Sequence, residues 1–186
     1  GFIATREDTG DALLATEPFK VGITTFALPL NGTKTLIDAN TDINVLTYTM
    51  VWMNNQNNFP VNAQITDNLP AGATLIPGSL TCEARGASTQ QTCTYDAAQN
   101  RIFWEGRVAE DPGATNADNA NNEIVFSFRV QVDPSMQVVT NQASSIIDAD
   151  LDNDFSDENP VVSVSDSNAS VWDRSQPTSG VNQPGT

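Results

Sequence analysis

Hydrophobic and polar residues alternate with a period of two along most of the chain. The clearest segment is 124–132, whose apolar positions share one face: Ile124, Phe126, Phe128, Val130 and Val132. Residues 45–53 and 61–69 alternate in the same way. This pattern is typical of strands with one buried face, and no segment has the periodicity of an amphipathic helix. We therefore expect an all-β protein.

Turn-forming residues separate these segments. Pro70 and Gly72 follow 61–69, and residues 96–100 interrupt a predicted hairpin between Tyr95 and Trp104. Further strands are expected at 138–147 and 160–165. Many short strands between turn signals are typical of an immunoglobulin-like antiparallel β-sandwich.

The two ends differ from this middle, so we divide the chain into an extended N-terminal arm (1–30), a β-sandwich domain (31–172) and a polar C-terminal tail (173–186). The arm is too apolar for a free linker at Val21, Ile23, Phe26, Leu28 and Leu30. It is a candidate donor strand for a neighbouring sandwich. The alternative is that residues 19–30 form an extra strand of their own domain. The tail has the composition of a flexible segment, and it is the alternative donor of a strand to a neighbouring sandwich.

The charge is strongly acidic, with 23 Asp and Glu against 8 Lys and Arg and a net charge of −15. This argues against nucleic acid and against anionic membrane surfaces as partners. No apolar run is long enough to predict a membrane span. The acidity is explained either by divalent cation binding or by solubility alone.

Cys82 and Cys93 are the only cysteines, and the chain contains no histidine. A zinc site is therefore not expected, and a disulfide closing a hairpin-like loop is the simplest interpretation. Because disulfides persist in oxidising surroundings, we expect a secreted, extracellular protein of the cell surface.

Five stretches occur in the order and spacing of a known module, namely 33–35, 46–54, 65–72, 95–96 ahead of Trp104, and 139–143. Through them, residues 33 to about 170 resemble the surface-protein repeat family catalogued as domain of unknown function 11. The resemblance implies an immunoglobulin-like sandwich of the kind found in bacterial and archaeal adhesins and surface fibres. The chain departs from the family in the insertion carrying the cysteines, in the longer 109–122 loop and in the acidic run after Ile147.

Lys34, Asp67 and Asn141 are polar residues at positions where alternation places their neighbours in the core. Burial favours a neutral lysine amine, which is a nucleophile, and a protonated acid, which can hydrogen-bond an amide. The three residues suit an autocatalytic isopeptide bond, in which the Lys34 amine attacks the Asn141 amide and ammonia leaves. The resemblance to surface domains that form such links favours this hypothesis. The alternatives are a Lys34–Asp67 ion pair beside a hydrogen-bonded Asn141, or an exposed Lys34.

Carboxylates alternate in the segment 148–159, at Asp148, Asp150, Asp152, Asp154 and Asp157. Such a loop can turn several oxygens toward one calcium ion, although it lacks the glycine and the final glutamate of an EF-hand. Asp38 and Asp42 repeat the alternation after the first domain strand. If the strands bearing Lys34 and Asn141 ran parallel, both acidic segments would emerge at one end of the domain. The alternative to calcium is a solvated acidic loop.

No nucleophile elbow, phosphate loop or metalloprotease motif occurs, so we do not expect an enzyme, although residue types alone leave glycoside hydrolysis open. We expect a structural subunit of an extracellular filament or pilus, a homopolymer stabilised by an isopeptide bond, a disulfide and calcium. One alternative is a non-assembling spacer repeat of a larger adhesin. Another is a carbohydrate-binding module, with Trp52, Trp104 or Trp172 stacking on a glycan, although alternation places Trp52 and Trp104 in the core.

Overall fold

The computed structural model describes residues 3–5, 12–14, 27–110, 122–152, 154–156, 163–164 and 170–175. Every regular element among them is a β-strand, which confirms the predicted all-β class. No helix in this part of the chain is long and apolar enough to cross a membrane.

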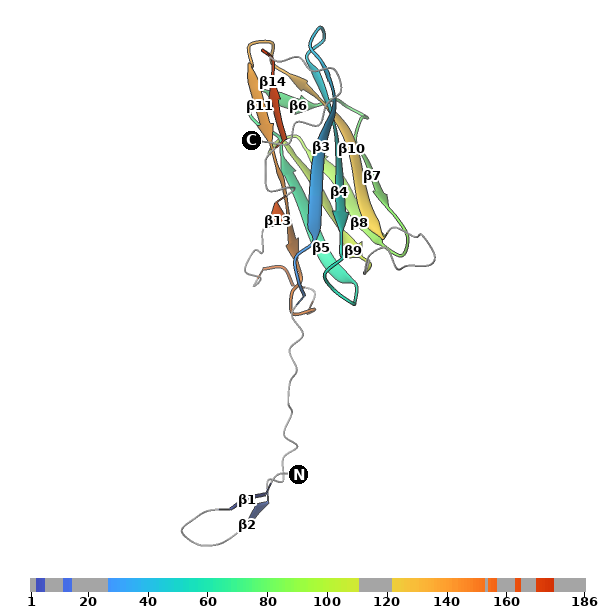
Figure 1. Ribbon diagram of the computed structural model, residues 1–186, viewed down its shortest axis with the longest axis vertical. Helices are drawn as coiled ribbons and strands as arrows, with labels where there is room; N and C mark the ends of the chain where they lie inside the picture. Colours follow the sequence, from blue (N-terminus) through green and yellow to red (C-terminus); the bar gives the residue numbers. More distant parts are fainter. Residues whose placement is uncertain are drawn as a thin grey trace.

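Two sheets make up the domain (Figure 1). The first has the order β3-β4-β10-β6, and β7 pairs with the other end of β10. Its strands are β3 (Asn31–Asn40), β4 (Val45–Met53), β6 (Ala73–Leu75), β7 (Thr81–Ala84) and β10 (Glu123–Val132). The second has the order β13-β12-β5-β9-β8. Its strands are β5 (Val61–Asn68), β8 (Thr89–Asp96), β9 (Arg101–Val108), β12 (Ala143–Ile147) and β13 (Ser163–Val164).

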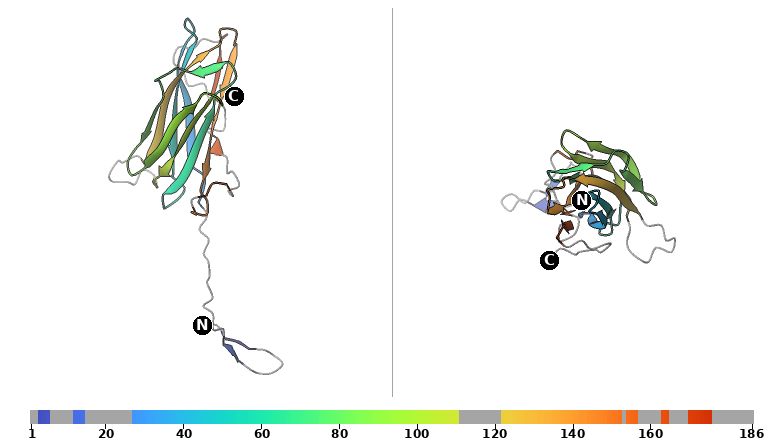
Figure 2. Two further views of the ribbon diagram at one scale, coloured as in Figure 1. Left: turned by 180° about the vertical axis from the view of Figure 1, so that it is seen from behind. Right: turned by 90° about the horizontal axis from the view of Figure 1, so that it is seen from above.

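All strand pairs within these sheets are antiparallel. The sheets pack face to face (Figure 2), and the chain is an immunoglobulin-like antiparallel β-sandwich, as predicted. Two short pairs lie outside the sheets. β1 (Ile3–Thr5) pairs with β2 (Ala12–Leu14), and β11 (Val138–Asn141) pairs with β14 (Ser170–Asp173).

The core lies where alternation predicted it. On β4, Tyr48, Met50 and Trp52 are fully buried, and the inward residues of β5 and β10 pack against them. Gly32 on β3 lies opposite Trp52 in the ladder, and a Cβ there would come within 2.4 Å of the indole ring. Glycine at this position therefore lets the largest core side chain lie against the edge strand.

The core also includes residues of both predicted end segments. Ala27 and Leu30 are buried, and the Ala27 amide donates a hydrogen bond of 2.9 Å to the Ala149 carbonyl. At the other end, the predicted boundary at residue 173 falls inside β14, and Trp172 on this strand is buried. Arg174 donates hydrogen bonds to Met136 and Asn44, at 2.9 and 2.8 Å. Residues on both sides of the predicted 31–172 bounds therefore contact the domain.

Several predicted features lie outside the described residues. They are Val21, Ile23 and Phe26 of the arm, residues 160–162 and 165 of the last predicted strand, and residues 176–186 of the tail. The predicted strand 138–147 divides at Gln142, because β11 before it pairs with β14 whereas β12 after it pairs with β5.

Candidate functional site

Lys34 lies on the edge strand β3, with its side chain fully buried. Its Nζ is 5.0 Å from the ring centroid of Tyr48 and 5.3 Å from that of Phe128. These two rings stack on each other with centroids 5.5 Å apart. Burial lowers the pKa of Lys34, because an ammonium ion loses its hydration in these surroundings. The structure therefore excludes the alternative in which Lys34 is exposed.

Asp67 reaches Lys34 from the opposite sheet. It lies on β5, its side chain is fully buried, and its Oδ2 accepts a hydrogen bond from Lys34 Nζ. The negative charge of Asp67 raises the pKa of Lys34, but by less than burial lowers it. The pair thus links the two sheets at a point from which water is excluded.

Asn141 lies at the end of β11 and is also buried. Val139, Asn141 and Ala143 all face inward, and Ala143 is the ladder partner of Asp67. Asn141 therefore lies two residues before Ala143, the residue that is opposite Asp67 in the ladder. Asn141 Oδ1 and Asp67 Oδ1 are buried and have no hydrogen-bond partner among the described residues. The Lys34–Asp67 ion pair of the alternative is present, and within the Asn141 amide it is Oδ1 that has no hydrogen-bond partner among the described residues.

The arrangement has a chemical use. Two opposite charges in a water-free interior are costly, and passing one proton from Nζ to Asp67 removes both charges. The product is a neutral amine, which is a nucleophile, next to a neutral acid that can donate a hydrogen bond to an amide oxygen.

Tyr48 is a polar residue of this site that the sequence analysis placed only in the core. Its hydroxyl is buried and has no hydrogen-bond partner in the part of the chain that the structure describes. Burial, and secondarily the charge of Asp67, raise the pKa of Tyr48, so the phenol stays protonated. The only signal in the sequence was a tyrosine instead of a phenylalanine at an inward position.

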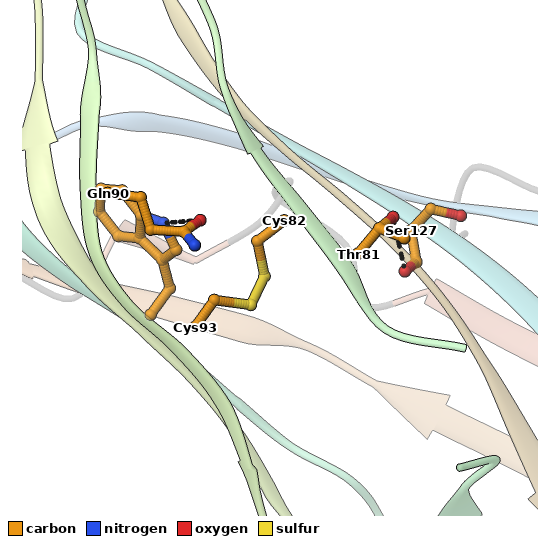
Figure 3. The surroundings of a disulfide bond; sticks show 6 residues. Thr81, Cys82, Gln90, Cys93 and Ser127 are labelled. Atoms are coloured by element: carbon orange, nitrogen blue, oxygen red, sulfur yellow. Dashed lines mark hydrogen bonds between the residues drawn. A yellow bond between two sulfur atoms is a disulfide. The ribbon is translucent and has the colours of Figure 1, made fainter. Parts of the chain in front are cut away.

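The predicted disulfide is present between Cys82 on β7 and Cys93 on β8 (Figure 3). β7 belongs to the first sheet and β8 to the second, so the bond joins the sheets along one edge. Thr81 donates a side-chain hydrogen bond of 3.3 Å to the Ser127 carbonyl beside it. The Lys34–Asp67 pair involves β3, at the opposite edge of the first sheet.

The acidic segment after β12 forms a compact cluster. Carboxylate oxygens of Asp148, Asp150 and Asp152 lie within 4.8 Å of one another, and Asp148 is buried. The Asp152 amide donates to Asp148 Oδ1 at 3.1 Å, and the Asp154 amide donates to Asp152 Oδ1 at 2.8 Å. These oxygens are of the type that calcium prefers. Asp157, also predicted as a ligand, lies outside the described residues.

Asp38 and Asp42 do not join this cluster. They lie at the far end of β3 and in the turn to β4, where the Val132 amide donates to the Asn44 carbonyl at 2.9 Å. Ala149 of the acidic segment instead contacts Ala27, just before β3 begins. β12 therefore ends where β3 starts, and the expectation of parallel strands with both acidic segments at one end is wrong (Figure 1).

The carbohydrate-binding alternative relied on tryptophan faces. Trp52 and Trp104 are fully buried, and Trp172 is only 4% exposed. Because each indole packs in the core, none of the three offers a face on which a sugar could stack.

No protein-family model matches the chain, so the resemblance to domain of unknown function 11 has no support from one. No curated protein matches the chain either. Among solved structures, the chain is similar to the collagen-binding domain of a Staphylococcus aureus adhesin, with 12% identity over 70% of this chain and 91% of that one and a TM-score of 0.45. It is also similar to the major pilin SpaD of Corynebacterium diphtheriae, with 18% identity over 63% of this chain and 30% of that one and a TM-score of 0.41.

A third similar structure is the pilus backbone of Streptococcus pneumoniae, with 11% identity over 64% of this chain and 32% of that one and a TM-score of 0.42. The chain thus spans about a third of each of the two pilins. All three identities are below 25% and all three TM-scores are below 0.5. None of the three similarities therefore indicates a function for this chain.

Proposed function

We propose that this chain is a structural module of an extracellular filament or pilus, whose sandwich is locked by an isopeptide bond between Lys34 and Asn141. The observation that carries the proposal is the fully buried Lys34–Asp67 pair, together with the buried Asn141 two residues before Ala143, the ladder partner of Asp67. The amide oxygen of Asn141 has no hydrogen-bond partner among the described residues. A passive core would gain stability from apolar residues at these positions, because a buried ion pair seldom repays its desolvation.

The reaction needs no external reagent. Asp67 takes a proton from Lys34 Nζ, and the free amine attacks Cγ of Asn141. Asp67 then passes this proton to Nδ2 and takes the second proton from Nζ. The Cγ–Nδ2 bond breaks, and ammonia leaves as the new Nζ–Cγ amide forms. One amine and one primary amide thus give one secondary amide and one ammonia. Folding holds the groups together, which replaces a bimolecular encounter with an intramolecular step.

The disulfide supports the extracellular part of the proposal. It joins β7 to β8 in a chain with no other cysteine, and such bonds are stable in oxidising compartments. Together with the proposed isopeptide bond it would give each long edge of the sandwich a covalent link. A subunit that must keep its shape outside the cell, without chaperones, benefits from both.

Intact mass spectrometry tests the cross-link. The mass of the wild-type protein should be about 17 Da below that of the disulfide-bonded sequence, which is the loss of one ammonia. Lys34→Ala and Asn141→Ala should each restore the full mass, and Asp67→Ala should leave the link largely unformed. A fragment joining residues 34 and 141 should appear after digestion. A wild-type protein with no missing ammonia would falsify the proposal.

Matched controls are available for both partners. Lys20 is the only other lysine of the chain, so Lys20→Ala is the matched lysine control. Asn68 lies exposed at the end of β5, next to Asp67, and serves as the asparagine control. Both control variants should lose ammonia as the wild type does.

A non-assembling spacer of a larger adhesin is the second candidate. The observation that favours it is the burial of Ala27 and Leu30 in the domain's own core. These residues belong to the arm expected to supply a donor strand, and they are already used within the subunit. An isopeptide bond is compatible with both a filament subunit and a spacer, so the cross-link test does not distinguish them. Whether the purified protein assembles into fibres does.

A further inference from the structure

The proposed reaction does not yet account for Tyr48. Its side chain is fully buried on β4, and its hydroxyl lacks a hydrogen-bond partner in the described part of the chain. Two rings lie against Lys34 Nζ, those of Tyr48 and Phe128, and only Tyr48 carries a hydroxyl. A buried, unpartnered polar group beside reactive atoms calls for an explanation, since packing alone would be served by phenylalanine.

The proposed attack on Asn141 requires hydrogen-bond donors at the amide oxygen Oδ1. When Lys34 attacks Cγ of Asn141, negative charge develops on Oδ1, and this oxygen has no donor before the attack. Asp67 supplies one donor after it has accepted the lysine proton. Enzymes commonly present two donors to such an oxygen, and a tyrosine hydroxyl with a neutral aspartic acid is a known pair for this purpose.

We propose that the Tyr48 hydroxyl and protonated Asp67 together form the oxyanion hole for Asn141 Oδ1 while Lys34 attacks. This inference depends on the proposed isopeptide bond. Tyr48 donates a hydrogen bond and keeps its proton throughout, so the overall balance of one amide formed and one ammonia released is unchanged. The raised pKa of Tyr48 is consistent with this, because it keeps the phenol a donor.

The test compares the rate of ammonia loss in Tyr48→Phe with that in the wild type. Protein is made in a cell-free reaction, samples are quenched in acid at intervals, and the linked fraction is read by intact mass. Losing one oxyanion donor should slow the reaction by about 100-fold to 1,000-fold. The matched control is Tyr95→Phe, because Tyr95 is the only other tyrosine of the sequence and its hydroxyl donates a 2.6 Å hydrogen bond to Asn100 Oδ1. It should react at the wild-type rate.

A second measurement separates catalysis from folding. In the Asn141→Ala background, where no link can form, Tyr48→Phe should melt at the same or a higher temperature, because the hydroxyl removed had no partner. A clear fall in melting temperature there would make the hydroxyl a structural group and overturn the inference. Equal rates for wild type and Tyr48→Phe would also overturn it while leaving the cross-link intact. A wild type that never loses ammonia would overturn both proposals.

Discussion

At the scale of single residues, the site depends on keeping water from a lysine and an aspartic acid. Both side chains are fully buried, and aromatic rings face the lysine. Alternation could predict this for Lys34, Asp67 and Asn141, because their apolar neighbours two positions away indicate which face is inward. Alternation could not single out Tyr48, since a tyrosine is ordinary in a sandwich core. That its hydroxyl lacks a hydrogen-bond partner among the described residues can be seen only in the structure.

The buried amine predicts a pH effect in the unlinked protein. In Asn141→Ala, Lys34 keeps its amine, and burial lowers its pKa below the ordinary value of 10.5. Between the folded and unfolded pKa values the unfolded chain binds more protons, so the free energy of unfolding rises with pH. In the linked wild type, Lys34 is an amide and does not titrate.

The stability advantage of the wild type over Asn141→Ala should therefore narrow as pH rises from about pH 7 toward about pH 10, where lysine ordinarily titrates. Urea unfolding of both proteins at several pH values measures this difference. If the difference in free energy of unfolding between the two proteins stays constant or widens, the folded protein stabilises the Lys34 cation at least as well as water does.

At the scale of elements, the sequence predicted best the strands that bury one face against the other sheet and alternate regularly, such as β4, β5 and β10. What it missed concerns pairing. Nothing local to residues 138–147 indicates that β14, from the far end of the chain, pairs with β11. The relative direction of β3 and β12 is likewise set by long-range packing, and for this reason Asp38 and Asp42 were wrongly grouped with Asp148.

Calcium at the acidic segment stays a prediction. Chelation should lower the melting temperature, and calcium should restore it better than magnesium, because flexible multi-oxygen loops favour the larger ion. At a free calcium concentration about 100 times the Kd, the gain is about 2.7 kcal/mol. Asp150→Asn should weaken the response.

The control for calcium is Asp133→Asn. Asp133 Oδ1 accepts a 2.8 Å hydrogen bond from the Ser135 amide, so it has the same local turn chemistry outside the cluster. Its loss should leave the calcium response unchanged. Identical melting curves with calcium and with chelator would identify 148–156 as a solvated acidic loop.

At the scale of the whole molecule, the filament proposal makes the N-terminal residues the connector between subunits. The described core begins at Ala27, so deleting residues 1–19 should leave the sandwich folded. Under the filament proposal this truncated protein should be monomeric, whereas the full chain should form fibres visible by negative-stain microscopy. Light scattering after size-exclusion chromatography measures the change.

Deleting residues 176–186 provides the comparison, because it removes a segment from the other end of the sequence. If the chain without residues 1–19 assembles as before, the N-terminal segment is not the connector. If the full chain does not assemble at all, the spacer interpretation is favoured.

The positions of Lys34 and Asn141 also determine how a pull on the chain would travel. Lys34 lies near the start of the sandwich and Asn141 near its last strands. A bond between them would carry tension directly from β3 to β11, and residues 35–140 would bear none of it. Cys82 and Cys93 both lie inside that bypassed loop. The disulfide would then resist thermal opening of one edge without ever bearing load, and a reducing medium would leave the extensibility of a stretched fibre unchanged.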